Sequence, residues 1–167
     1  MRILSVCGSL QRKSANLTLL SRAAALAPPG VYVQHYDGLR DLPHFNPELE
    51  HESPLPTVLE LRDAVAGSDA LLIATPEYGH SLPGALKNAI DWLIGTGELE
   101  RKLVAITSAV PSADRGLRGL KALSDTLGAV SARIAFASPI VRGPGLDQDV
   151  TELLSALLAR AAESREP

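Results

Sequence analysis

A short polar loop near the start of the chain carries residue types that together can hold a phosphate group. Hydroxyl, amide and guanidinium groups there can cradle a phosphate monoester with the help of backbone N–H groups at a helix start. The set comprises Ser9, Gln11, Arg12, Ser14 and Asn16. We interpret this loop as an anion site. The alternative is that Ser14 is simply the N-cap of the following helix, since serine is a preferred cap.

The spacing in this loop excludes two familiar phosphate motifs. Lys13-Ser14 matches the end of the nucleoside-triphosphate motif, but its two glycine positions hold Cys7 and Arg12. The dinucleotide fingerprint needs three glycines, and only Gly8 is present. The sequence therefore indicates neither an ATP site nor a dinucleotide pyrophosphate site.

A second loop could hold a flat polar ring. It reads TPEYGHSLPG over residues 75–84 and follows an apolar run, with Pro76 and Gly79 as turn residues. Backbone N–H and C=O groups in such a loop can line the edge of a ring, and Tyr78 offers an aromatic face. The alternative is an ordinary surface turn, which is what Gly/Pro loops usually form.

Both loops belong to a regular alternation of strand and helix patterns. Short apolar runs predict strands over residues 3–6, 31–35, 70–74, 103–107 and 132–136. Helical spacing appears over 17–27, 58–65, 82–93, 117–127 and 150–161, and 37–56 reads as irregular. This order predicts an α/β fold with a parallel sheet and helices on both faces. Ligands then bind beyond the carboxyl ends of the strands, where loops 8–14, 76–81 and 108–115 lie.

Composition narrows the class of protein. A chain of 167 residues, 46% hydrophobic and 21% charged, suits one domain over residues 1–167. A net charge of −3 argues against a nucleic-acid partner, and no apolar run approaches membrane-spanning length. One cysteine and no export signal at the start favour the cytoplasm. The four histidines lack zinc-ligand spacing, so we expect no metal site.

The two loop sequences resemble a known family. GSLQRKSAN over residues 8–16 and PEYGHSLPGALKNAIDW over 76–92 are similar to the two signatures of the NAD(P)H-dependent FMN reductases, which include chromate, quinone and azo-dye reductases. Asp41-Leu42-Pro43 extends the similarity. The resemblance implies a flavodoxin-like three-layer sandwich, with a five-stranded parallel sheet of order 2-1-3-4-5.

The resemblance also implies the roles of individual residues. The FMN phosphate would be surrounded by Ser9, Gln11, Ser14 and Asn16, with Arg12 beside them. The isoalloxazine ring would be lined by Pro76, Glu77, Tyr78 and Gly79, with Ser108 as a further ring contact. Two positions depart from the family. Gln11 stands where arginine is common, and the usual glycine-rich run is replaced by AVPSADRG over 109–116.

The implied activity is an FMN-dependent NAD(P)H oxidoreductase. NADPH or NADH would give a hydride to flavin N5, and electrons would pass in a ping-pong sequence to a quinone, azo, metal-oxyanion or free-flavin acceptor. No catalytic side chain is expected, because the flavin carries the chemistry. A homodimer or homotetramer would form through the helix over Leu82–Leu93, in which Trp92 is either a candidate contact or simply a core residue. A flavodoxin-type electron carrier and a non-enzymatic FMN-binding or regulatory protein remain open.

Overall fold

The computed structural model, which describes residues 1–52 and 55–163, is built around a five-stranded parallel sheet. Its strands are β1 (Arg2–Cys7), β2 (Tyr32–Tyr36), β3 (Ala70–Ala74), β4 (Leu103–Thr107) and β6 (Arg133–Ala137). Their order across the sheet is β2-β1-β3-β4-β6. This confirms the predicted order, because β6 is the fifth strand of this sheet along the chain.

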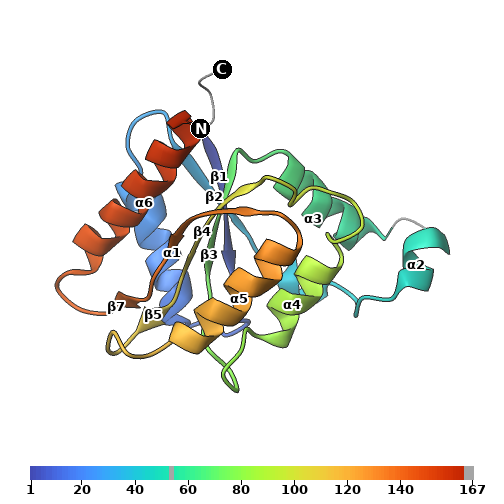
Figure 1. Ribbon diagram of the computed structural model, residues 1–167, viewed down its shortest axis with the longest axis horizontal. Helices are drawn as coiled ribbons and strands as arrows, with labels where there is room; N and C mark the ends of the chain where they lie inside the picture. Colours follow the sequence, from blue (N-terminus) through green and yellow to red (C-terminus); the bar gives the residue numbers. More distant parts are fainter. Residues whose placement is uncertain (53–54, 164–167) are drawn as a thin grey trace.

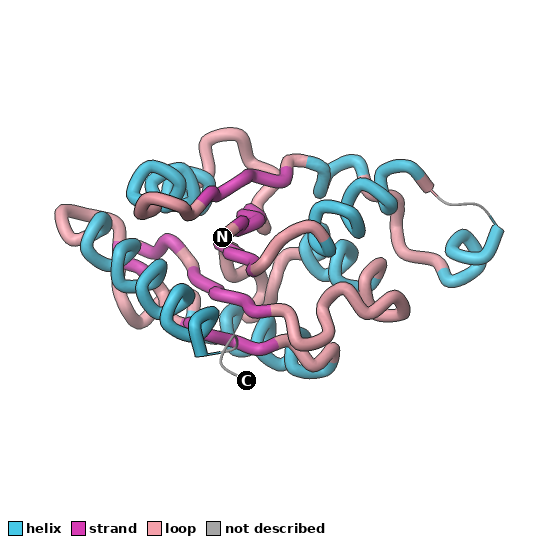
Figure 2. The backbone as a smooth tube through the Cα atoms, turned by 90° about the horizontal axis from the view of Figure 1, so that it is seen from above, coloured by secondary structure: helices cyan, strands magenta, loops and turns pink. Residues whose placement is uncertain are grey.

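Helices cover both faces of the sheet, as the sequence predicts. One face carries α1 (Ala15–Leu26) and α6 (Leu146–Glu163), and the other carries α3 (Pro56–Ala66), α4 (Gly84–Asp91) and α5 (Leu117–Ala129) (Figure 1). Figure 2 shows the strands between these two helical layers. The arrangement confirms the flavodoxin-like three-layer sandwich.

The alternation of side chains along each strand divides the core into two halves. On β3, Leu71 and Ile73 pack towards α3, α4 and α5, whereas Leu72 packs towards α1 and α6. Successive side chains of a strand point to opposite faces, so a strand covered on both sides must be apolar throughout. All five residues of β3 and all five of β4 are buried. This is why both strands are evident in the sequence as unbroken apolar runs.

Three details differ from the sequence prediction. The stretch predicted as irregular over 37–56 contains a 3-10 turn, η1 (Gly38–Asp41), and a short helix, α2 (Pro47–Glu52). The helix predicted to start at Leu82 starts at Gly84, with Pro83 at its N-cap. A small second sheet was missed, in which β5 (Ala109–Val110) pairs with β7 (Ile140–Val141). Residues 53–54 and 164–167 of the predicted domain lie outside the described residues, and the single domain over 1–167 stays a prediction.

The indole of Trp92 anchors the segment after η1 to the end of α4. Its Nε1 donates to the carbonyl of Pro43 over 2.8 Å, and Asn88 Nδ2 donates to the same oxygen over 2.9 Å. The Phe45 ring meets the indole edge-on, with centroids 5.0 Å apart. Trp92 is only 1% exposed, which agrees with the alternative of a core residue and not with a contact to a second subunit. Its side chain belongs to the core of the protomer.

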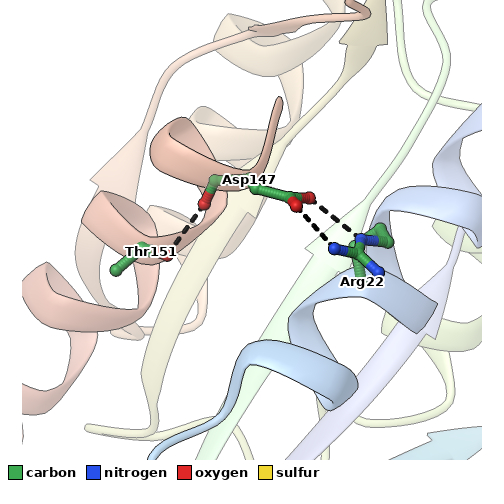
Figure 3. A network of polar contacts seen from close by, with 3 residues as sticks. All are labelled: Arg22, Asp147 and Thr151. Atoms are coloured by element: carbon green, nitrogen blue, oxygen red, sulfur yellow. Dashed lines mark hydrogen bonds and ion pairs between the residues drawn. The ribbon is translucent and has the colours of Figure 1, made fainter. Parts of the chain in front are cut away.

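The helices α1 and α6 are joined at the surface by a two-point ion pair. Arg22 Nε and Nη2 donate to the two carboxylate oxygens of Asp147 over 2.9 and 2.5 Å (Figure 3). Thr151 lies one turn after Asp147 in α6, and its hydroxyl donates to the Asp147 backbone carbonyl (Figure 3). Both charged side chains are about half exposed, so solvent screens the pair and its stabilisation is small. Its main effect is to orient the start of α6 against α1.

Candidate functional site

Glycine at position 8 brings the end of β1 against the start of the loop after β3. The Gly8 amide donates to the Ala74 carbonyl over 2.9 Å. A Cβ at this position would lie 2.3 Å from Thr75 Oγ1, closer than any real contact. The phosphate loop and the ring loop therefore begin side by side at the same edge of the sheet.

Ser14 is the N-cap of α1. Its Oγ accepts a hydrogen bond from the Asn16 amide over 3.2 Å, and its backbone is extended, as an N-cap requires. The side chain is buried, and Cys7 Sγ lies 3.9 Å from the hydroxyl oxygen. The capping interpretation is correct, and it is compatible with the phosphate interpretation. A capping serine keeps its hydroxyl hydrogen for a further acceptor, beside the positive end of the helix.

Asn16 connects the phosphate loop to the loop after β4. Its Oδ1 accepts from the Ala109 amide over 2.8 Å, although the two residues are far apart in the chain. Ser108 precedes that amide and is buried, with its carbonyl bonded to the Ile140 amide over 2.9 Å. The predicted phosphate residue Asn16 is thus hydrogen-bonded to the residue that directly follows the predicted ring residue Ser108.

The other predicted phosphate residues of the first loop line a separate cavity and not the start of α1. Ser9, Gln11 and Arg12 line a cavity of about 360 Å³ between this loop and the segment after β2. Its other side includes Arg40 and Asp41. The backbone amide of Gln11 donates a hydrogen bond to Ser9 Oγ over 3.2 Å, which closes a tight turn in the loop. The structure therefore divides the predicted phosphate residues into two groups: the buried pair Ser14 and Asn16 at the helix start, and the half-buried Ser9 with the exposed Gln11 and Arg12 along the cavity.

A second cavity, of about 310 Å³, opens between the loops that follow β3 and β4. Two of the predicted ring residues, Pro76 and Glu77, line it together with Ser108. Its size falls at the lower end of the range for small-molecule sites. It lies at the carboxyl ends of adjacent parallel strands, where ligands of open α/β sheets bind.

Tyr78 and Gly79 form a tight turn at the rim of this site. The backbone groups of Tyr78 and Ser81 bond each other in both directions, over 2.9 and 3.0 Å. Gly79 and His80 between them both have positive φ, of 55° and 63°. Turns of this kind favour glycine at such positions. Tyr78 is 56% exposed, and neither Tyr78 nor Gly79 is among the residues that line the cavity.

The carboxylate of Glu77 is held by two groups of the protein. One oxygen accepts from the Gly119 amide over 2.9 Å, and the other lies 3.2 Å from His80 Nδ1. The Gly119 hydrogen bond is the largest cause that holds the pKa of Glu77 below its ordinary value. Glu77 is therefore a fixed carboxylate at neutral pH. Gly119 gave no signal in the sequence, because its partner lies in another loop.

The loop after β4 is ordered by its own contacts, although it lacks the family's glycine-rich run. The Arg115 amide donates to the Ser112 carbonyl over 3.1 Å, and the Ser112 hydroxyl donates to Asp114 over 2.5 Å. Val110, Pro111 and Arg115 line the cavity. The sequence places them in a loop expected to bind ligands, but of this loop only Ser108 was predicted as a site residue.

Metal ligation and membrane crossing can be examined directly in the described part of the chain. Over residues 1–52 and 55–163, no three side chains of His, Cys, Asp or Glu come together as a metal ion would require. Over the same ranges, no helix combines the length and the apolar character needed to cross a membrane.

The geometry defines a class of protein: a flavodoxin-like α/β domain with a ring-sized cavity beside a capped helix start. Residues 1–141 match the family described as NADPH-dependent FMN reductase. The chain belongs to this family.

Curated relatives agree with this placement, and a solved structure agrees with the fold. An NAD(P)H-dependent FMN reductase of Pseudomonas aeruginosa is 39% identical over 92 residues, which is 55% of this chain and 49% of that protein. A quinone reductase of Pseudomonas putida is 36% identical over 125 residues, which is 73% of this chain and 67% of that protein. The flavoenzyme NAD(P)H:(acceptor) oxidoreductase FerB of Paracoccus denitrificans superposes with a TM-score of 0.75 at 24% identity, covering 95% of this chain and 97% of that one. The alignment with the first of these spans about half of the relative's length.

Proposed function

We propose that this protein is an FMN-dependent NAD(P)H oxidoreductase that reduces a small-molecule acceptor. The observation that carries the proposal is the hydrogen bond from the Ala109 amide to Asn16, over 2.8 Å. It fixes a capped helix start, suited to a phosphate, beside a cavity of about 310 Å³ that suits a flat ring. FMN is a ligand that combines these two parts.

The residues present fit such a ligand. At the phosphate end, the Ser14 hydroxyl and the first-turn amides of α1 would donate hydrogen bonds, and the helix dipole favours the negative charge. At the ring end, backbone groups of Pro76 and Glu77 and the buried Ser108 would line the edge. Ser9, Gln11 and Arg12 face the neighbouring cavity, from which they would approach the phosphate from outside.

FMN held by these residues would supply hydride-transfer chemistry between NADPH or NADH and a quinone, azo, metal-oxyanion or free-flavin acceptor. The protein's part would be to line the ring edge with Pro76, Glu77 and Ser108 and to neutralise the phosphate at the start of α1. No side chain needs to act as an acid or a base, and Glu77 is occupied by its own hydrogen bonds.

An absorbance spectrum of the purified protein with FMN, recorded before and after addition of NADPH, tests this proposal. We expect a flavin spectrum that bleaches with NADPH and returns when a quinone is added. Steady-state rates at several concentrations of both substrates should give the parallel lines of a ping-pong mechanism. Protein that stays colourless and shows no thermal shift with FMN would support the non-enzymatic alternative. Two well-separated one-electron steps in a redox titration would support the electron carrier.

The quaternary structure and location belong to the same proposal. We propose a homodimer or homotetramer formed through the Leu82–Leu93 region, and a cytoplasmic protein with no nucleic-acid or membrane partner. Ile94, directly after this region, is 54% exposed, which suits a covered apolar contact. Light scattering should give a multimer for the wild type and a smaller species for Ile94→Glu. Leu59→Glu, at a 40% exposed position on α3, is the matched control and should leave the mass unchanged.

A further inference from the structure

The helix α5 begins without a capping side chain of its own. Its N-cap is Gly116, with φ of +78°, and the first turn contains no acidic residue. The amides of a first helical turn have no partners within the helix and need acceptors from elsewhere. An acceptor from another part of the chain would therefore connect that part to the start of α5.

Glu77 provides that acceptor. It lies in the ring loop after β3, and one carboxylate oxygen accepts from the Gly119 amide over 2.9 Å. The Arg118 amide also interacts with this carboxylate. Counting from the Gly116 N-cap, these are the second and third helical residues, which are the usual partners of a capping oxygen. A negative charge at this end of a helix is also favourable for the helix dipole.

The absence of a side chain at position 119 permits this contact. A Cβ on Gly119 would lie 2.9 Å from Glu77 Cβ and 3.1 Å from Glu77 Cα. The backbone of the ring loop therefore packs directly against the first turn of α5. By contrast, a Cβ on Gly128, in the same helix, would meet no atom within 4 Å.

We propose that Glu77 is a positioning residue that caps α5 from the ring loop and thereby fixes the width of the cavity between the loops after β3 and β4. Pro76 and Glu77 form one side of that cavity, and Val110, Arg115 and Gly116 are on the other side. The hydrogen bond from the Gly119 amide to Glu77 joins these two sides at the first turn of α5. This role rests on the proposed function, because the cavity is the proposed ring site.

Two pairs of variants test the role. Glu77→Ala removes the acceptor, whereas Glu77→Gln retains an oxygen that can accept from Gly119. Gly119→Ala displaces the ring loop, and Gly128→Ala is its matched control. For each variant, we would measure amide hydrogen exchange of residues 117–120 without FMN, the FMN dissociation constant by fluorescence, and the visible circular dichroism of the bound flavin.

We expect Glu77→Ala and Gly119→Ala to speed exchange in the first turn of α5 and to weaken FMN binding about tenfold, since a hydrogen bond to a charged group is lost or strained. The visible circular dichroism should change in both, because the ring is held differently. Glu77→Gln should restore most of the exchange protection and the dichroism, and Gly128→Ala should match the wild type. Wild-type exchange, affinity and dichroism in Glu77→Ala would overturn the proposal.

The two proposals fail in distinguishable ways. A wild-type protein that does not bind FMN would contradict the proposed function, while hydrogen exchange without FMN would still decide whether Glu77 caps α5. If Glu77→Ala and Gly119→Ala do not fold, Glu77→Gln decides. In that folded variant, we expect a modest increase in exchange confined to residues 117–120, and no local increase would overturn the cap.

Discussion

An alanine at position 8 should loosen the site at the point where both of its loops begin. A Cβ there would lie 2.3 Å from Thr75 Oγ1, 2.8 Å from Thr75 Cβ and 3.1 Å from Leu86 Cδ2. Thr75 is only 1% exposed, so its side chain has no solvent to rotate into. Relief of the clash therefore requires the ends of β1 and β3 to separate by about 1 Å, which strains a well-packed core.

The expected cost is that of overpacking, about 1–3 kcal/mol in the free energy of unfolding. For a domain of this size, each kcal/mol of lost stability lowers Tm by roughly 2–4 °C. The Tm of Gly8→Ala should therefore be about 2–12 °C below that of the wild type. The Gly8 amide donates to the Ala74 carbonyl at the end of β3, so the ring loop should shift as well. Urea and thermal unfolding followed by circular dichroism measure the first effect, and an FMN titration measures the second.

Gly84→Ala is the matched control for this substitution. Gly84 is the first residue of α4, and a Cβ there would meet no atom within 4 Å. We expect unchanged stability or a gain of up to about 1 kcal/mol, because alanine restricts the unfolded chain. Adding Thr75→Gly to Gly8→Ala should recover part of the FMN affinity. An unfolding midpoint and an FMN affinity equal to the wild type in Gly8→Ala would refute the steric reasoning.

Three further predictions test other parts of the structure. Ser14→Ala should weaken FMN binding more than Arg12→Ala, and should also destabilise the protein by about 1 kcal/mol through loss of the N-cap; the reverse order in a fluorescence titration would contradict our interpretation of the loop. Trp92→Phe removes the hydrogen bond to the Pro43 carbonyl and should cost about 1–2 kcal/mol in urea unfolding, whereas equal stability would show that the bond is dispensable. The lowered pKa of Glu77 means that its charge stabilises the fold above the unperturbed pKa of about 4.3 and that this contribution is lost as pH falls. The wild type should therefore have a higher free energy of unfolding than Glu77→Gln at pH 7, and this difference should shrink when unfolding is measured at acid pH.

The sheet could be predicted from the sequence because its central strands are covered on both faces. The predicted bounds of the strand over residues 70–74 and of the strand over 103–107 match β3 and β4. The strands β5 and β7 were missed, since two residues are too few to show a periodic pattern. The helix α2 was missed because the prolines around it suggested an irregular segment.

The candidate site could be predicted only where its residues are adjacent in the chain. The Ser14 cap and the turn at Gly79 follow from local rules for helix starts and for positive φ. The bond from the Ala109 amide to Asn16 and the bond from the Gly119 amide to Glu77 join different loops. Such pairs depend on how the strands are arranged, which no short motif records.

The packing of α1 beside α6 means that one face of the sheet is covered only after α6 has been synthesised. The buried face beneath these helices includes Leu19 from α1 and Leu153 from α6. A nascent chain that has emerged as far as β6 already has all five strands of the main sheet, yet half of that face is still open to solvent. Until α6 emerges and Asp147 pairs with Arg22, apolar side chains of this face stay exposed on the ribosome-bound chain and can promote aggregation. The emergence of α6, rather than formation of the sheet, would then set how long this apolar face needs protection from aggregation.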